Sequence, residues 1–128
     1  MSRINKKIHY HDTDCAGVVY YANYLKYFEE ARTEYMAAKG VDIRELARQG
    51  ILFVVRRAEI DYNAPAYYGD NLAIFSEVIK TKNVSLEFFQ EAKREGQILV
   101  SAKTKIVCVD QSFTPKALSP EIAKCLKT

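Results

Sequence analysis

The chain has 128 residues, 48% of them hydrophobic, which suffices for one buried core and leaves little room for another, so we expect a single domain over residues 1–128. The net charge of +3 comes from scattered basic residues, so no basic stripe points to nucleic acid, and no apolar run approaches the ~20 residues of a membrane span. The first residues, MSRINKK, lack the apolar segment of a signal peptide, and we therefore expect a cytoplasmic protein.

Polar and apolar residues alternate from Arg3 to Tyr10, a pattern typical of a half-buried strand. His9 and His11 would share one face of this strand if it extended that far, and with a nearby acid they would offer ligands to a divalent metal. A third ligand at a fixed position is not evident in the sequence. We therefore predict no metal site.

A helix is predicted after Asn23, because apolar residues recur there at helical spacing. Asn23 is the expected N-cap, and Gly40 stands where a left-handed residue would end the helix. The positions of the predicted buried stripe are Tyr24, Phe28, Ala31, Tyr35 and Ala38.

An acidic turn precedes this helix, with Asp12, Asp14 and Gly17 followed by an apolar run. A helix N-terminus presents unpaired N–H groups and the positive end of the dipole, which stabilise developing negative charge. A carboxylate beside such amides is the arrangement that acyl transfer requires, and Asp14 is that carboxylate. For an arbitrary D-x-D sequence the simpler interpretation is a turn in which the acids bind their own backbone and Gly17 adopts a positive φ.

The chain then favours a second, short helix over Val41 to Gly50, with Asp42 as N-cap and Glu45 in a capping box. Ile51 to Ala64 follows as a strand. Its opening run, ILFVV, predicts burial on both faces. Proline at position 65 ends the strand, because it cannot continue a central ladder.

Three further strands are predicted at Leu72 to Lys80, Val84 to Arg94 and Ile98 to Val109, with Glu95-Gly96 as a hairpin turn. In the last strand, alternate residues from Ile98 to Cys108 form the expected core face. A short helix starting at proline is predicted from Pro120 to Leu126. The order of elements indicates an α+β fold in which one long helix lies against one face of an antiparallel sheet.

Three blocks of sequence carry a family resemblance: DTDCAGVVYYANYLKYFEEAR at 12–32, FVVRRAEIDYNAPAYYGDNL at 53–72 and VCVD at 107–110. In this order they resemble the 4-hydroxybenzoyl-CoA thioesterase family, and especially its YbgC-like acyl-CoA thioesterases. The resemblance implies the hotdog fold, a curved five-stranded antiparallel sheet wrapped around one long central helix. At the end of the first block, Glu29 and Arg32 would form an i, i+3 pair on the helix.

The same resemblance implies the residues of the active site. The catalytic carboxylate corresponds to Asp14, the backbone amide that polarises the thioester carbonyl corresponds to Tyr21, and Gly17 shapes the turn. Val18 and Tyr24 are expected to contact the substrate, although the alternative for a tyrosine such as Tyr24 is packing in the core with its hydroxyl reaching water. YbgC-like members often have histidine at the position of Tyr21, so tyrosine makes the site resemble hydroxybenzoyl-CoA enzymes.

Arg56 and Arg57 follow the apolar run of the predicted central strand. In a coenzyme A thioesterase, such arginines would bind phosphates of the substrate or hold Asp14 and its turn in place. The alternative is that one of them pairs with Glu59 or Asp61 on the sheet surface. The sequence supports both interpretations equally.

The function implied by the resemblance is hydrolysis of an acyl-CoA to free acid and coenzyme A, without a cofactor, by a homodimer that assembles into a homotetramer with active sites at the dimer interface. The alternative is a non-catalytic protein that binds acyl-CoA or acyl carrier protein, although a pure binder has no need of Asp14. Cys15, with His9 or His11 as base, is an alternative nucleophile. The odd number of cysteines, three, argues against a disulfide framework. A serine hydrolase lacks support because no G-x-S-x-G is present, and a dehydratase would need a histidine and acid pair that the motif lacks.

Overall fold

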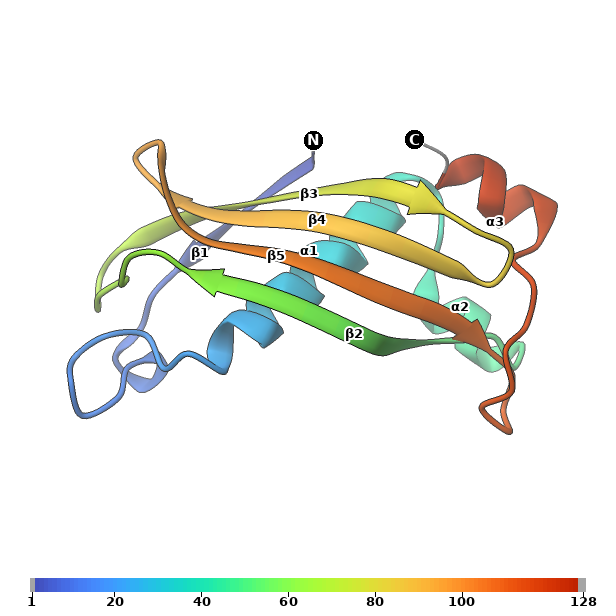
Figure 1. Ribbon diagram of the computed structural model, residues 1–128, viewed down its shortest axis with the longest axis horizontal. Helices are drawn as coiled ribbons and strands as arrows, with labels where there is room; N and C mark the ends of the chain where they lie inside the picture. The colour runs from blue at the N-terminus through green and yellow to red at the C-terminus, as the bar shows by residue number, and fades with distance from the viewer. Residues whose placement is uncertain (1, 127–128) are drawn as a thin grey trace.

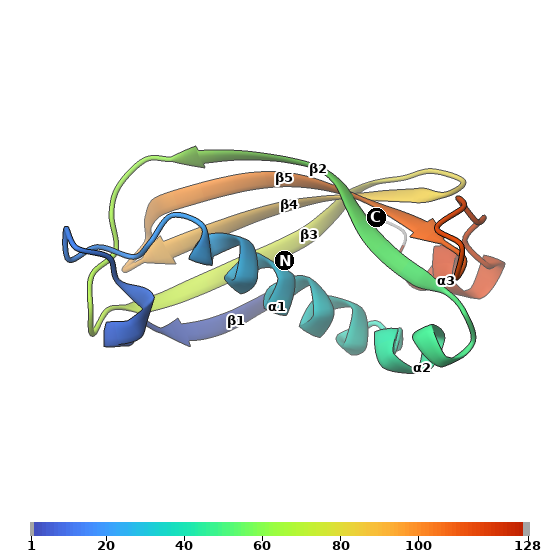
Figure 2. The same ribbon diagram turned by 90° about the horizontal axis from the view of Figure 1, so that it is seen from below.

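The computed structural model describes residues 2–126, which form one antiparallel sheet and three α-helices (Figure 1). The strand order is β1-β3-β4-β5-β2. Figure 2 shows the sheet curving around one side of α1, which is the predicted hotdog arrangement. The elements are β1 (Ser2–Lys7), a 3₁₀ helix (Tyr10–Asp12), α1 (Asn23–Ala38), α2 (Ile43–Arg48), β2 (Leu52–Tyr62), β3 (Asn71–Thr81), β4 (Ser85–Arg94), β5 (Gln97–Val109) and α3 (Pro120–Cys125).

Helix α1 buries one face against the sheet, as its apolar spacing predicts, except that Ala38 at its last position is exposed. The aromatic residues of its first half pack with β3 and β5, and those of its second half pack with β4 and the short helices. Burial of large side chains of this kind contributes roughly 1.5–3 kcal/mol each. The buried residues of α1 are Tyr24, Tyr27, Phe28, Ala31, Arg32, Tyr35 and Met36.

The ends of the helices agree in part with the predictions. Asp42 caps α2 by accepting hydrogen bonds from the backbone N–H groups of Arg44 and Glu45, and Gly40 has φ +85° just after α1. The prediction of Asn23 as N-cap of α1 is wrong. Asn23 is already helical, and its side-chain amide instead donates to the carbonyl of Asp12, 2.9 Å away.

The prediction that the ILFVV run is buried on both faces is wrong for the single chain. Strand β2 lies at the edge of the sheet and pairs only with β5, so one side of its backbone has no strand beside it among the described residues. Val55 is 54% exposed. An apolar edge strand with unpaired backbone groups is a surface that proteins usually cover by association.

The core face of β5 was predicted correctly from Val100 to Cys108 but not at its start. Ile98 is 40% exposed and Leu99 is fully buried. The register with β4 shifts between Ala92 and Lys93, and this irregularity next to the hairpin reverses the inward and outward positions.

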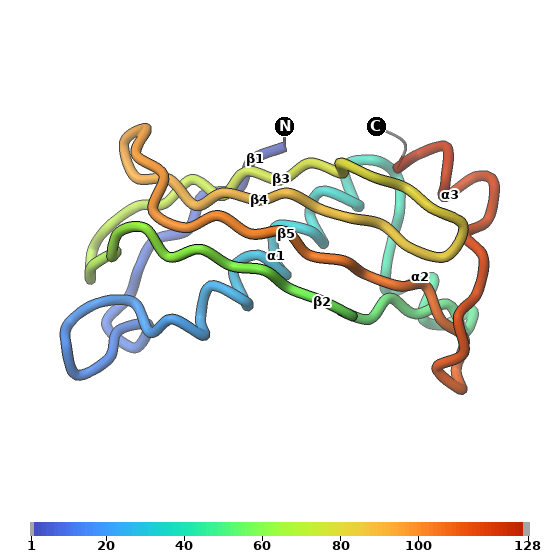
Figure 3. Tube along the Cα trace, viewed as in Figure 1, coloured from blue at the N-terminus to red at the C-terminus, as the bar shows by residue number. Residues whose placement is uncertain are grey.

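Strand β1 ends at Lys7, earlier than the predicted Tyr10, because the chain turns there into the 3₁₀ helix. The loop after β1 and the turn between β2 and β3 lie at the same end of the sheet (Figure 3). Among the residues described, no helix is long and apolar enough to cross a membrane.

Candidate active site

The first acid of the D-T-D sequence, Asp12, holds the loop in place. Asp12 is only 5% exposed, and its side chain accepts a hydrogen bond of 2.8 Å from the N–H of His9. Its carbonyl accepts hydrogen bonds from the N–H of Tyr20 and the side chain of Asn23, both at 2.9 Å. Burial raises the pKa of Asp12, but the His9 bond, the nearby Tyr27 hydroxyl and neighbouring positive charges outweigh it, so the pKa lies below its usual value. Asp12 therefore fastens the loop to the start of α1.

The second acid, Asp14, lies in a tight turn and is exposed. One carboxylate oxygen, Oδ1, accepts a hydrogen bond of 2.9 Å from the N–H of Ala16, and the other has no hydrogen-bond partner among the described residues. The turn is closed by a bond of 2.9 Å from the N–H of Asp14 to the carbonyl of Val18. Gly17 has φ +81°, the positive value that this turn was predicted to need. The carboxylate is thus oriented by the backbone and still open to a ligand.

The backbone at Tyr21 meets the requirement for an amide that polarises a carbonyl. The N–H groups of Tyr21 and Ala22 donate to no group among the described residues, and they stand immediately before the first residue of α1. The hydroxyl of Tyr62, on β2, donates a hydrogen bond of 3.1 Å to the carbonyl oxygen of Tyr21. Two unpaired amides at the positive end of a 16-residue helix form an anion-stabilising site.

A cavity of about 270 Å³ opens beside these amides, between the start of α1 and the end of β2. It brings together three of the predicted site residues, Val18, Tyr21 and Tyr24. Asp14 and Gly17 lie in the adjoining turn. The cavity is lined by Val18, Val19, Tyr21, Tyr24, Tyr62, Asn63, Ala64 and Pro65.

The walls of this cavity are largely aromatic. The rings of Tyr21 and Tyr24 both lie edge-on to Tyr62, with centroids 6.1 Å and 5.8 Å away. The Tyr24 hydroxyl is buried without a hydrogen-bond partner in the described chain, and burial raises its pKa to about 12. This hydroxyl stays protonated throughout the range in which an enzyme works.

Arg56 and Arg57 are not brought to this cavity. Both are exposed on β2, and the guanidinium of Arg57 pairs with the carboxylate of Glu59. Neither residue lines the cavity beside Tyr21. Of the two interpretations of this arginine pair, pairing on the sheet surface is therefore the one seen within a single chain.

The predicted pair between Glu29 and Arg32 is absent among the described ion pairs. Glu29 accepts a hydrogen bond from the hydroxyl of Thr33, whereas Arg32 turns inward and donates 3.1 Å to the side-chain oxygen of Gln90. Burial lowers the pKa of the Arg32 guanidinium. Gln90 was not among the predicted residues, although a polar residue between the core positions Phe88 and Ala92 of β4 indicates a buried hydrogen-bonded group.

The alternative of Cys15 as nucleophile with His9 or His11 as base has less support from the structure. The rings of His9 and His11 stack with centroids 5.7 Å apart, outside any strand. Cys15 is exposed in the turn beside Asp14, with no hydrogen bond from either imidazole among the residues described. Within residues 2–126, no group of three or more histidine, cysteine, aspartate or glutamate side chains is arranged to hold a metal ion.

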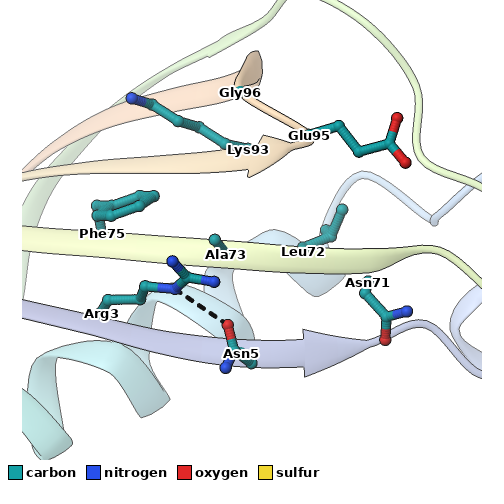
Figure 4. A pocket seen from close by; sticks show the side chains of 9 residues that line it. All are labelled: Arg3, Asn5, Asn71, Leu72, Ala73, Phe75, Lys93, Glu95 and Gly96. Atoms are coloured by element: carbon teal, nitrogen blue, oxygen red, sulfur yellow. Dashed lines mark hydrogen bonds between the residues drawn. The ribbon is translucent and has the colours of Figure 1, made fainter.

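A larger hollow, of about 670 Å³, lies on the sheet face away from α1 (Figure 4). Arg3 and Lys93 stand on either side of the Phe75 ring there, at 5.7 Å and 5.0 Å from its centroid. It contains none of the predicted site residues. We therefore place the candidate active site at the start of α1.

Comparison with known proteins shows the family of the chain. The family model of the Thioesterase-like superfamily matches residues 8–126. The chain belongs to this superfamily. It is 39% identical over 118 residues to the acyl-CoA thioesterase YbgC of Haemophilus influenzae, covering 91% of this chain and 87% of that one.

Two further relatives have aromatic substrates in their names. The 1,4-dihydroxy-2-naphthoyl-CoA hydrolase of Nostoc punctiforme is 31% identical over 126 residues, covering 97% of this chain and 85% of that one. The structure of the DHNA-CoA thioesterase from Staphylococcus aureus superposes with a TM-score of 0.93 at 25% identity, covering 97% of this chain and 87% of that one. The predicted family, the hotdog fold and the assignment as a thioesterase are confirmed.

Proposed function

We propose that this thioesterase hydrolyses acyl-CoA to a free acid and coenzyme A, with Asp14 as the catalytic carboxylate and the Tyr21 amide as the oxyanion donor. One observation supports this proposal above the others. A single loop carries an exposed carboxylate with a free oxygen and, at its other end, an unpaired amide at the N-terminus of α1. The named activity of the YbgC relative agrees with it.

In this mechanism the thioester carbonyl oxygen accepts a hydrogen bond from the N–H of Tyr21. The carbonyl carbon becomes more electrophilic, and the negative charge that develops on its oxygen is stabilised by the amide and the helix dipole. Loss of an oxyanion donor of this kind typically costs a factor of about 10²–10³ in kcat. Because the donor is a backbone group, no change of the Tyr21 side chain removes it directly.

Asp14 completes the reaction by one of two routes. As a nucleophile, its carboxylate oxygen attacks the carbonyl carbon, the coenzyme A thiolate leaves, and water hydrolyses the resulting mixed anhydride. As a general base, it takes a proton from the water that attacks the same carbon. Both routes need the free carboxylate oxygen that the turn leaves open.

The acyl group is proposed to enter the cavity lined by Val18 and Tyr24, where aromatic walls suit an aryl or a short aliphatic group. A second hollow, of about 580 Å³, lies further along α1 and β2 and includes Leu25 and Val55. It would accommodate a longer chain. Acyl carrier protein is the second carrier of thioesters to be tested beside coenzyme A.

We further propose a homodimer, assembled into a homotetramer, in which the edge of β2 is covered by a second copy. The support is the unpaired side of this strand together with exposed apolar side chains on both walls of the adjoining hollow, Val55 and Leu25. Strand edges of this kind are generally covered in native assemblies.

The test measures thiol release from a panel of short-chain, long-chain and aromatic acyl-CoA substrates, and from one acyl carrier protein thioester. Asp14→Asn keeps the size of the side chain and its bond to Ala16, and we expect kcat to fall at least about 100-fold with the fold and the assembly unchanged. Cys15→Ser is the matched control in the same turn, and it should retain activity. Full activity in Asp14→Asn would show that this carboxylate is not catalytic, and loss of activity in Cys15→Ser alone would identify Cys15 as the nucleophile. Binding of acyl-CoA without thiol release would favour the non-catalytic alternative.

A further inference from the structure

The loop that carries Asp14 rests on the turn between β2 and β3, residues 65–70, which we name the platform turn. The N–H of Val19 donates to the carbonyl of Ala66 at 2.9 Å, and Val18 forms a backbone bridge with Tyr67. Ala66 is completely buried. The position of the platform turn therefore sets the position of the loop between Asp14 and Tyr21.

One guanidinium holds the platform turn at several points. Arg94, the last residue of β4, donates from Nη1 to Oδ2 of Asp70 at 2.7 Å and to the carbonyl of Pro65 at 3.1 Å. The same carboxylate oxygen of Asp70 accepts the N–H of Tyr67 at 2.8 Å. The first, middle and last parts of the turn are thus joined to the end of the sheet through one ion pair.

The environment of the pair makes these bonds stronger than those of an open surface pair. Each of the two side chains is 24% exposed, and the guanidinium also lies over the Tyr67 ring, 5.8 Å from its centroid. Charge-assisted bonds in a partly desolvated position are short and roughly twice as strong as neutral ones. A lysine at position 94 would keep the charge, but it lacks the rigid planar group that directs Nη1 to both acceptors while lying over the Tyr67 ring.

Neither Arg94 nor Asp70 lines the cavity beside Tyr21, so neither contacts a substrate bound there. Their influence on the reaction would pass through the platform turn and the Val19 amide. We propose that Arg94 and Asp70 are a positioning pair that holds the loop in its catalytic geometry and controls the rate of the chemical step. This inference rests on the proposed function of Asp14 and the Tyr21 amide.

The test compares Arg94→Met, Arg94→Lys and Asp70→Asn with the wild type by two measurements. Amide hydrogen exchange of Val19 reports the bond between the loop and the platform turn, with Phe88 in the centre of the sheet as internal reference. Steady-state hydrolysis of acyl-CoA separates kcat from KM. Arg48→Met, which removes an exposed pair with Glu45 on α2, is the matched control.

We expect Arg94→Met to lower the exchange protection of Val19 by about 10-fold to 100-fold, because the platform turn that carries its acceptor loses its charge-assisted bonds, while Phe88 is unchanged. The value of kcat should fall by a similar factor, with KM within about threefold of wild type. Arg94→Lys should show Val19 protection and kcat values between those of Arg94→Met and the wild type. Asp70→Asn keeps the shape of the turn, and it provides the measurement if Arg94→Met does not fold.

Unchanged Val19 protection in Asp70→Asn and in every folded Arg94 variant would overturn the inference, as would lost protection with an unchanged kcat. A uniform loss of protection at Val19 and Phe88 would also overturn it, because the pair would then stabilise the fold as a whole. If the wild type hydrolyses no acyl-CoA, the proposed function fails, and the positioning of the loop is then judged by Val19 exchange alone.

Discussion

The buried side chain of Gln90 gives the sharpest prediction on stability. Its amide nitrogen donates to the carbonyl of Phe28 and the hydroxyl of Ser76, both at 2.9 Å, and its oxygen accepts from Arg32 at 3.1 Å. Gln90 is completely buried and Arg32 is 9% exposed. Among the described residues, no acid lies within ion-pair distance of Arg32, so this one amide oxygen is the acceptor of a buried cation.

Gln90→Leu keeps the volume of the side chain and removes all three bonds. A hydrogen bond to a charged group contributes about 1.5–3 kcal/mol and a neutral one about 0.5–1.5 kcal/mol, and a buried charge without a partner adds to the cost. We expect Gln90→Leu to lower the free energy of unfolding by about 3–5 kcal/mol. Arg32→Met also removes the desolvated charge, and its effect should stay below about 2 kcal/mol.

The double variant Arg32→Met/Gln90→Leu tests the physical reason. If the unpaired cation causes most of the loss, the double variant should be more stable than Gln90→Leu by about 2 kcal/mol. Urea unfolding at pH 7 measures these differences, at one fixed protein concentration because assembly would shift the midpoint. A double variant no more stable than Gln90→Leu would refute the reasoning and show that the buried charge is not the source of the cost.

Three further predictions concern the loop and the edge strand. Tyr62→Phe removes the donor to the Tyr21 carbonyl, and kcat should fall about 3-fold to 10-fold with little change in stability; an unchanged kcat contradicts a positioning role. Because the folded pKa of Asp12 is lowered, its stabilising contribution is present above its unfolded pKa of about 4 and is lost as the pH falls through its folded pKa. Asp12→Asn should therefore unfold at a lower temperature than wild type at pH 7, and the difference should shrink in acid; a pH-independent difference contradicts this. Val55→Asp should dissociate the assembly, as measured by sedimentation, and reduce activity, as measured by thiol release. Ile79→Asp, which changes another exposed apolar residue, on β3 (41% exposed against 54% for Val55), should do neither.

Local features of the chain were predictable from the sequence because neighbouring residues determine them. The spacing of apolar residues predicted α1, Asp42 predicted the start of α2, and Gly40 predicted the left-handed conformation just after α1. The turn at Gly17 belongs to the same class. The family resemblance added the fold and the thioesterase assignment, since its motifs span most of the chain.

Contacts between distant segments were decided only by the tertiary structure. The apolar run of β2 predicted a central strand, but its place at the sheet edge follows from the strand order, which no local pattern encodes. The exposure of Ile98 follows from a register shift against β4. The sequence pattern predicted a local ion pair between Arg32 and Glu29. In the folded chain Arg32 instead donates a hydrogen bond to Gln90, which is 58 residues away in the sequence.

The candidate site shows the same division. Asp14 and the Tyr21 amide lie in one continuous segment, so sequence and resemblance sufficed to nominate them. The residues that hold this segment come from elsewhere: Tyr62 from β2, and Arg94 with Asp70 from the ends of β4 and the platform turn. Hydrogen bonds of this kind depend on strand register and on distances between side chains, and these exist only once the sheet has formed.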